Sequence, residues 1–366
     1  MMDESSALPN ISAVDLFCGA GGLTHGLVRS GITVRAGIDV DPACKYPYEA
    51  NNAAEFIERD VNELRAEELR PYFPEGDISL LAGCAPCQPF STYSRSGRSK
   101  KRGLDWQLVS TFGSLIKDLQ PTLVTMENVP QLADHSVFKE FLSALAGYAV
   151  TWSVVECAKL GIPQTRRRLV LLASKLGHEG LSIPETFGTR STVRQTIARL
   201  PRIEAGQQHP RDPLHYASSL SETNLRRIRA SKPGGTWRDW DPELLAACHR
   251  KDTGTSYPSV YGRMEWDAPA PTMTTQCFGY GNGRFGHPEQ DRAISLREAA
   301  MIQTFPRKYK FVKKGEPVIF KSLGRLIGNA VPVQLGEVIG SSLVAHVNAV
   351  SGVAASALGD TQDTLF

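Results

Sequence analysis

The sequence predicts an α/β fold, with a doubly wound, Rossmann-like domain joined to a smaller irregular domain. In residues 1–180, short apolar runs alternate with segments that have apolar residues at helical spacing. This alternation is typical of a largely parallel sheet covered by helices. It then stops, and Gly, Pro, His and Arg replace the long apolar runs. We therefore expect residues 1–180 to form the doubly wound domain and residues 181–290 the irregular one.

The composition is ordinary for a globular chain, but the charges are unevenly distributed. The 366 residues are 41% apolar and 22% charged, and the length allows one large or two medium domains. Residues 1–80 carry 14 Asp or Glu against 6 Lys or Arg, whereas residues 190–263 carry 13 Lys or Arg against 7 Asp or Glu. This fits a small-molecule domain followed by a nucleic-acid-facing one, although a solvated surface would explain either count.

Cysteine usage and the first residues predict a cytoplasmic protein. Seven cysteines are scattered along the chain, as is typical of reduced thiols. The start, Met-Met-Asp-Glu-Ser-Ser, lacks the apolar core of a signal peptide. Residues 338–359 contain no Asp, Glu, Lys or Arg but are interrupted by Ser, His, Asn and Gly. We expect a packed helix there and no membrane span.

The first expected strand, residues 14–17, enters a glycine-rich turn at residues 18–22, and a helix begins at Leu23. Glycines in such a turn let a ligand lie against backbone N–H groups. A phosphate-binding Lys-Ser/Thr pair is missing, which argues against a nucleoside triphosphate.

Two further strands are expected to end in acidic residues. Residues 33–38 lead to Asp39, whose carboxylate could accept hydrogen bonds from ribose hydroxyls or cap the next helix. Asp41 is the better candidate for the cap. Residues 56–59 lead to Asp60, which could contact an adenine amino group.

An apolar run at residues 78–82 predicts a buried strand followed by a stiff turn with two thiols, Cys84 and Cys87. The pair could be a redox couple, half of a zinc site, or two structural thiols. No second Cys-x-x-Cys or spaced His pair completes a zinc site. Residues 88–104 contain five basic residues and no acid: Arg95, Arg98, Lys100, Lys101 and Arg102. This loop favours Cys87 as a nucleophile that faces a polyanion.

A helix is expected at residues 106–119 and another strand at residues 121–126, followed by Glu127. A carboxyl group at that position can be purely structural. If the strands run parallel, however, Glu127 and Cys87 end at the same edge of the sheet. The carboxyl group could then hold the polar edge of a base while the thiol attacks its ring.

Three adjacent arginines at residues 166–168 stand between the last two expected strands, residues 148–157 and 169–173. Such a run is usually a basic surface. Here it falls on the side of the sheet where the other polar groups are expected.

These features occur in the same order as the sequence motifs of the DNA (cytosine-5)-methyltransferases. On the strength of these features, the sequence resembles that family. The matching segments are Asp-Leu-Phe-x-Gly-x-Gly-Gly (residues 15–22), Pro86-Cys87-Gln88 with Ser91, Glu127-Asn128-Val129, Gln164-x-Arg166-x-Arg168, residues 292–305 and residues 327–332. The resemblance covers residues 13–345 except the irregular segment, and chance agreement of ordered motifs is small.

The resemblance implies a doubly wound S-adenosylmethionine-dependent methyltransferase domain. The positions it assigns to the cofactor are Phe17, Gly19, Ala20, Gly22, Leu23, Asp39, Val40, Asp60, Pro86, Leu108, Asn329 and Val331. Asp39 stands where the family usually has Glu, and Val40 stands where an aromatic residue often stacks on adenine. No metal is needed.

The implied reaction is methyl transfer to carbon 5 of a cytosine that is flipped out of a specific duplex DNA sequence, through a covalent adduct on Cys87. The catalytic residues would be Cys87, Glu127, Arg166 and Arg168. Gln88 and Ser91 would contact DNA.

The resemblance also implies how the chain is organised. Residues 181–290 would be the target-recognition domain and residues 291–320 a connection. Residues 321–350 would return to the catalytic domain, and residues 351–366 would be a flexible tail. We expect a monomer that binds double-stranded DNA, and a cognate restriction endonuclease acting separately is a candidate partner.

Three alternatives remain open at this point. A transfer-RNA cytosine-5 methyltransferase uses the same motifs. An inactive DNA-binding homologue is less favoured, because Cys87 and Glu127 are both present. A thiol-redox protein would instead form a reversible Cys84–Cys87 disulfide and transfer no methyl group.

Overall fold

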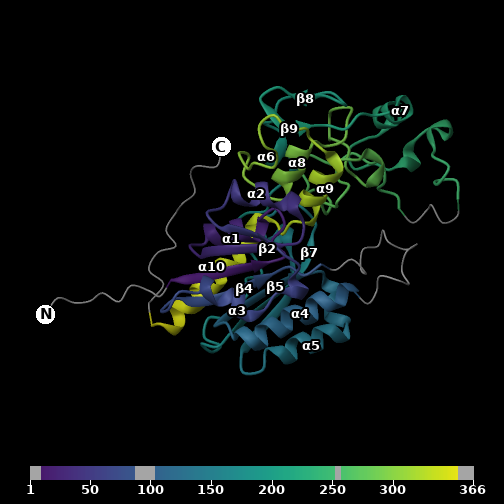
Figure 1. The fold of residues 1–366 in the computed structure, drawn as a ribbon. Helices are drawn as coiled ribbons and strands as arrows, with labels where there is room; N and C mark the ends of the chain where they lie inside the picture. The colour runs from purple at the N-terminus through teal and green to yellow at the C-terminus, as the bar shows by residue number, and fades with distance from the viewer. Residues whose placement is uncertain (1–9, 87–103, 252–256, 353–366) are drawn as a thin grey trace.

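The computed structural model describes residues 10–86, 104–251 and 257–352. A mixed sheet lies between two layers of helices, and an irregular part packs above it in the view of Figure 1. Three predicted site residues, Cys87, Gln88 and Ser91, lie outside the described residues. So does the predicted flexible tail from residue 353 onward.

The central sheet has seven strands in the order β3-β2-β1-β4-β5-β7-β6. Their bounds are β1 Ile11–Leu16, β2 Thr33–Asp39, β3 Glu55–Glu58, β4 Ile78–Gly83, β5 Leu123–Asn128, β6 Ala149–Glu156 and β7 Arg167–Ser174. The first five strands run parallel, and β7 runs antiparallel to both β5 and β6. The predicted doubly wound α/β fold is confirmed. The carboxyl ends of β1, β4 and β5 therefore share an edge with the start of β7.

Two predicted strand boundaries are wrong in a way that matters for the site. The sequence places Glu127 after a strand and Arg168 in a turn, but both lie inside strands. The reason is antiparallel pairing: β5 pairs with β7 as far as Asn128 and Leu169, and Arg168 pairs with Val155 of β6. The backbone of both charged residues is thereby fixed by the sheet.

Different helices cover the two faces of the sheet. One face packs against α3 Ala66–Leu69, α4 Leu104–Leu119 and α5 Ser136–Ala144, and the other against α1 Gly22–Arg29 and α10 Val333–Val350. Neighbouring strand residues point to opposite faces, so Ala13 belongs to the α1 and α10 side and Val14 to the α4 side.

The last helix, α10, completes the core as predicted. An added Cβ at Gly26 of α1 would lie 2.3 Å from the Val333 carbonyl oxygen, and one at Gly336 would lie 2.9 Å from the Leu23 carbonyl oxygen. The two helices can approach this closely only because both positions are glycine. By length and hydropathy Phe320–Val350 could cross a membrane, but 67% of its most apolar window is buried within the protein. This burial is typical of a core helix.

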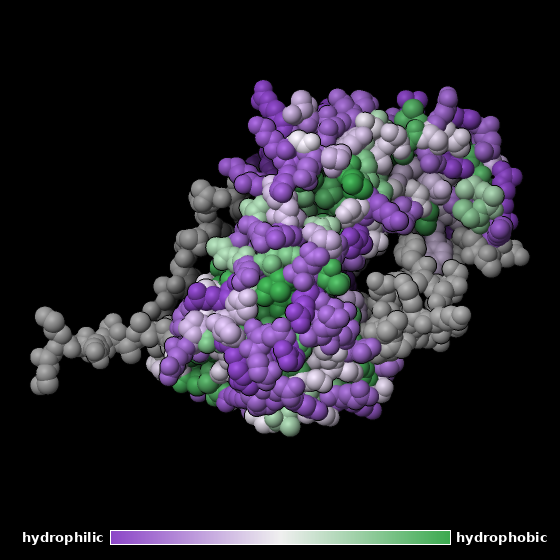
Figure 2. Space-filling model, viewed as in Figure 1, coloured by the Kyte–Doolittle hydropathy of each residue, from purple (hydrophilic) through white to green (hydrophobic). Residues whose placement is uncertain are grey.

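Between β7 and α10, the described chain has few α-helices and strands, as the composition of residues 181–290 predicts. They are α6 Val193–Ile197, β8 Gln208–His209, β9 Asp212–Tyr216, α7 Glu222–Ala230, α8 Leu296–Ile302 and α9 Phe320–Asn329. The face visible in Figure 2 is mainly hydrophilic, with small hydrophobic patches. Tyr48 and Phe56 of the first part share one buried cluster with Leu296 and Phe305. The domain boundaries given above remain a prediction.

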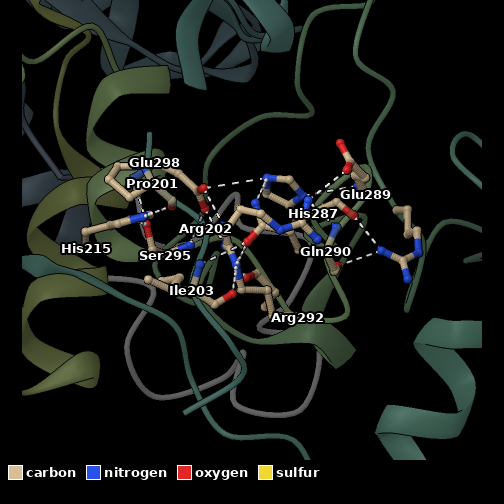
Figure 3. Close-up of polar contacts among 12 residues, drawn as sticks. Pro201, Arg202, Ile203, His215, His287, Glu289, Gln290, Arg292, Ser295 and Glu298 are labelled. Atoms are coloured by element: carbon tan, nitrogen blue, oxygen red, sulfur yellow. Dashed lines mark hydrogen bonds and ion pairs between the residues drawn. The ribbon is translucent and has the colours of Figure 1, made fainter. Parts of the chain in front are cut away.

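A buried polar network joins α8 to the irregular part (Figure 3). Arg292 donates two hydrogen bonds to the Glu298 carboxylate, at 2.7 and 2.8 Å, and the backbone N–H of Ser295 donates a third at 2.7 Å. His287 Nε2 lies 3.7 Å from the same carboxylate. Burial alone would raise the pKa of Glu298, but the charge and hydrogen bonds of Arg292 outweigh burial and lower the pKa to about 2.

His287 is expected to make stability fall in weak acid. Burial lowers the pKa of its imidazole to about 4, and Nδ1 accepts hydrogen bonds from the backbone N–H groups of Glu289 (3.1 Å) and Gln290 (2.9 Å). The unfolded state, with a His pKa of 6.5, binds the proton first. The contribution of neutral His287 to the free energy of unfolding is therefore complete above pH 6.5. It is lost as the pH falls toward 4, by about 3 kcal/mol in total.

Urea unfolding at several pH values between these limits measures that loss. His287→Asn is the matched variant, because its side-chain carbonyl can accept the same two N–H groups but does not titrate. The difference in unfolding free energy between wild type and variant should change with pH. A constant difference would show that His287 does not control acid stability.

Candidate active site

The predicted catalytic residues of the described chain gather where β4 and β5 end and β7 begins. Parallel pairing of β4 with β5 places Cys84 next to Glu127. Glu127 is 2% exposed, and its carboxylate has a charged or polar neighbour on each oxygen. Cys84 Sγ donates to Oε2 at 2.7 Å, and Arg168 Nε lies 2.8 Å from Oε1. The sheet edge thus holds a buried carboxylate with a fixed orientation.

The turn that leads to Cys87 is held on both sides. The backbone N–H of Cys84 donates to the Leu16 carbonyl at 3.3 Å, which ties it to the end of β1. Asn128 Nδ2 donates to the Ala85 carbonyl at 3.1 Å. The Asn of the Glu-Asn-Val motif therefore fixes the backbone two residues before Cys87.

Arg166 is buried and is held by the late part of the chain. Its Nη1 donates to the carbonyl oxygens of Met273 (3.2 Å) and Gly328 (3.3 Å). Burial and the nearby charge of Arg168 lower the pKa of its guanidinium to about 10. Arg166 thus joins the catalytic edge to the segments around residues 273 and 328. Its predicted contact with a base or phosphate remains a prediction.

A buried pair of glutamines reinforces this junction. Gln164 Nε2 donates to Gln303 Oε1 at 2.7 Å, and Gln303 Nε2 donates to the Ile327 carbonyl at 2.7 Å. The segments at residues 164–168, 292–305 and 327–332 therefore meet through two side-chain amides. Sequence reasoning assigned no role to either glutamine.

The glycine turn after β1 has a backbone that is open toward solvent at one position. Phe17, Gly19 and Gly21 have φ values of 59°, 54° and 86°, and an added Cβ at Gly19 would meet no atom within 4 Å. The Gly19 N–H donates to Asp39 Oδ2 at 3.0 Å, and Asp41 N–H donates to Asp39 Oδ1 at 3.0 Å. Asp39 therefore holds the turn in shape, and burial raises the pKa of its carboxyl group.

The segment at residues 327–332 returns to this turn. An added Cβ at Gly22 would lie 2.1 Å from the Val331 carbonyl oxygen, so Gly22 is required for the return of the chain. Val331 is buried and Asn329 is exposed. Val331 thus lies against the glycine turn, whereas the predicted return of residues 321–350 as a whole and the contact of these two residues with a cofactor remain predictions.

The other predicted cofactor residues differ in accessibility. Val40 is 64% exposed, Leu108 and Pro86 are half-buried, and Ala20 and Leu23 are buried. Asp41 caps the short turn Pro42–Cys44, as expected, and Asp60 caps Val61–Glu63 through the backbone N–H of Asn62. An open glycine backbone, an acidic group and an exposed apolar side chain along one edge fit a nucleoside-containing cofactor.

Two groups at this edge were missed from the sequence. Burial raises the pKa of the Asp15 carboxyl group to about 7, although Thr24 Oγ1 donates to it at 2.7 Å. Its place at the start of the matching segment at residues 15–22 was the available signal. The contact of Cys84 with Glu127 was also missed, because Cys84 was weighed only against Cys87.

The doubly wound α/β fold of this chain is similar to that of a solved structure. That structure, assigned to a DNA modification methyltransferase from an E. coli prophage, has a TM-score of 0.70 at 21% identity, and the match covers 93% of this chain and 100% of that one.

Sequence relatives identify the family. The family model for C-5 cytosine-specific DNA methylases matches residues 11–345. The chain is 52% identical to the Type II methylase M.HgiDII of Herpetosiphon aurantiacus over 339 residues, which is 91% of this chain and 94% of that relative. It is 33% identical to the Type II methyltransferase M1.BsuMI of Bacillus subtilis over 352 residues, 90% of this chain and 79% of the relative. The chain belongs to the C-5 cytosine-specific DNA methylases and is a DNA (cytosine-5)-methyltransferase related to those of restriction-modification systems.

Proposed function

We propose that this enzyme transfers a methyl group to carbon 5 of a cytosine that is flipped out of a specific duplex DNA sequence. The observation that carries the proposal is the buried Glu127 carboxylate, held by Arg168 and Cys84 at the strand edge from which Cys87 follows. The glycine turn and Asp39 lie at the carboxyl ends of neighbouring strands in the same sheet.

Carbon 5 of cytosine is a poor nucleophile, and the Cys87 thiolate would correct this. Its sulfur forms a bond to carbon 6, and the electron pair of the 5,6 double bond becomes available at carbon 5. When bound, S-adenosylmethionine would supply the methyl group to that carbon, and the electron pair of the broken sulfur–methyl bond would stay on its sulfur. Removal of the carbon 5 proton then restores the double bond and expels the Cys87 thiolate.

Glu127 and the arginines would hold the base for this addition. Electron density moves toward ring nitrogen 3 as the sulfur adds, and a carboxyl group at the nitrogen 3 and amine edge stabilises the protonated ring. Arg168 orients that carboxyl group. Arg166 would fix the base or the neighbouring phosphate through the buried junction that it forms.

Burial of Glu127 supports base flipping. A carboxylate that is 2% exposed at the end of a central strand is out of reach of a base stacked inside a duplex. The nucleotide must therefore leave the stack to meet both Glu127 and the thiol.

We assign recognition of the target DNA sequence to the irregular part, residues 181–290. Residues 190–263 carry the excess of basic residues noted above, and the catalytic edge does not need them. Arg, Asn and Gln side chains on a shaped surface read base edges, whereas phosphate contacts give affinity alone. We infer a monomer that acts on double-stranded DNA, with Gln88 and Ser91 in contact with it and a cognate endonuclease acting separately.

The test is direct mapping of 5-methylcytosine in DNA from cells that express the chain. One repeated sequence context should be methylated. A second assay uses duplex oligonucleotides with 5-fluorocytosine at that site, because fluorine at carbon 5 is not lost and the adduct accumulates. Mass spectrometry should place the adduct on Cys87. Methylation of RNA alone would favour the transfer-RNA activity, and a reversible Cys84–Cys87 disulfide without methylation would favour the redox interpretation.

Asp39→Ala is expected to weaken binding of S-adenosylmethionine about tenfold, since the variant loses a charged acceptor at the strand end. Stability should also fall by about 1 to 3 kcal/mol, because the N–H groups of Gly19 and Asp41 lose their acceptor. Titration calorimetry of the folded variant measures binding, and the exposed neighbour Glu58→Ala is the control. Equal affinity in wild type and Asp39→Ala would remove Asp39 from the cofactor site.

A further inference from the structure

The second contact of Glu127, with the Cys84 thiol, has no part in the reaction described above. Cys84 Sγ donates to Oε2 at 2.7 Å while Arg168 Nε lies 2.8 Å from Oε1, so the two neighbours occupy different oxygens of one carboxylate. We propose that Cys84 is a positioning residue that sets the plane of the Glu127 carboxylate for the incoming base. The inference rests on the proposed role of Glu127 in holding cytosine.

The backbone of Cys84 is placed accurately enough for this role. It follows directly after β4, and its N–H is bonded to the Leu16 carbonyl of β1. The residue before it, Gly83, is packed so closely that an added Cβ would lie 3.0 Å from the Phe112 ring and 3.2 Å from the Leu16 carbonyl oxygen. The residue after it is held by Asn128. The sheet therefore delivers the thiol to Glu127 from a fixed position.

A single contact would leave the carboxylate free to turn. The last side-chain torsion of Glu is broad, and rotation about it exchanges the directions of the lone pairs. The ion pair with Arg168 joins Nε to Oε1. A donor on Oε2 fixes the remaining rotation, and a thiol can act as that donor. The unshared lone pairs then point in one direction, which matters because a base edge must be met within a fraction of an ångström.

Two substitutions distinguish hydrogen-bond donation by residue 84 from simple filling of the space beside Glu127. Cys84→Ser keeps a donor at nearly the same place, whereas Cys84→Ala removes it. We measure single-turnover methylation with a tritiated methyl group, at saturating duplex DNA and S-adenosylmethionine. The rate constant should fall about five- to tenfold in Cys84→Ala and should stay within about twofold of wild type in Cys84→Ser. The dissociation constants for DNA and S-adenosylmethionine should be unchanged, and thermal unfolding checks that both variants fold.

A double-mutant cycle with Glu127→Gln tests whether Cys84 acts through Glu127. If it does, Cys84→Ala should cost little more in the Glu127→Gln background, since the carboxylate that it orients is already gone. If the rate losses of the two single variants multiply in the double variant, the proposal is overturned. Equal rates for Cys84→Ala and wild type would also overturn it. If Glu127→Gln falls below detection, the Ser and Ala comparison decides alone. Failure of the proposed function would look different, because wild type itself would then form no adduct with 5-fluorocytosine DNA.

Discussion

Replacing Cys87 with serine should abolish methylation, with a loss of about three orders of magnitude or more. The thiolate is the attacking species, and a serine hydroxyl stays protonated at neutral pH and adds poorly to carbon 6 of a pyrimidine. The turn before Cys87 is fixed by Leu16 and Asn128, so the substitution should not disturb the fold. Rates on duplex DNA, measured with wild type and variant side by side, check the loss.

Cys84→Ser is the matched control, because it makes the same change three residues earlier and should keep most of the activity. Calorimetry should show that both variants still bind S-adenosylmethionine. Full turnover by Cys87→Ser would end the covalent mechanism. Equal loss in both serine variants would indicate damage to the turn rather than removal of a nucleophile.

Glu298→Gln should lower the free energy of unfolding by about 3 to 5 kcal/mol. Glu298 is 1% exposed and Arg292 is fully buried, so the variant leaves an uncompensated buried guanidinium (Figure 3). The carboxylate offers two acceptor oxygens to Arg292 and the Ser295 N–H, whereas the glutamine amide offers only one. Because the free energy of unfolding of a folded domain is only about 5 to 15 kcal/mol in total, such a loss is severe. Urea unfolding at neutral pH measures it.

Glu289→Gln is the control for that experiment. It removes the same charge next to another arginine, Arg202, at 2.8 Å, but both side chains are mostly exposed, at 60% and 70%. The expected change is below about 0.5 kcal/mol. Similar losses in both variants would mean that the buried network contributes no more than a surface pair.

The strand edge was predictable because its signals are local. Apolar runs, the glycine turn and the acids at strand ends fix β1 to β5, and parallel pairing then brings Glu127 to the thiol turn. The length of β5 was not predictable, because its last residues are strand only through pairing with β7, more than forty residues later.

The hydrogen-bond partners of Arg166 could not be predicted from the sequence for the same reason. Arg166 donates to Met273 and Gly328, which are 107 and 162 residues away in sequence. A run of arginines looks like a surface until the segments that bury it are placed. Likewise, Gly22 looked like part of a ligand-binding turn, and only the structure shows that Val331 occupies the space beside it.

The packing of α1 against α10 has a consequence for how the chain is made. α1 and α10 are joined by glycine contacts and by the ion pair of Arg29 with Glu337 (3.1 Å), yet about three hundred residues of synthesis separate them. While the ribosome is still translating the middle of the chain, the apolar face of the sheet that α10 will cover stays open. Non-local closure of this kind is slow and leaves an aggregation-prone intermediate. A nascent chain therefore cannot complete the edge at Gly22 until residue 331 and the helix after it have left the ribosome.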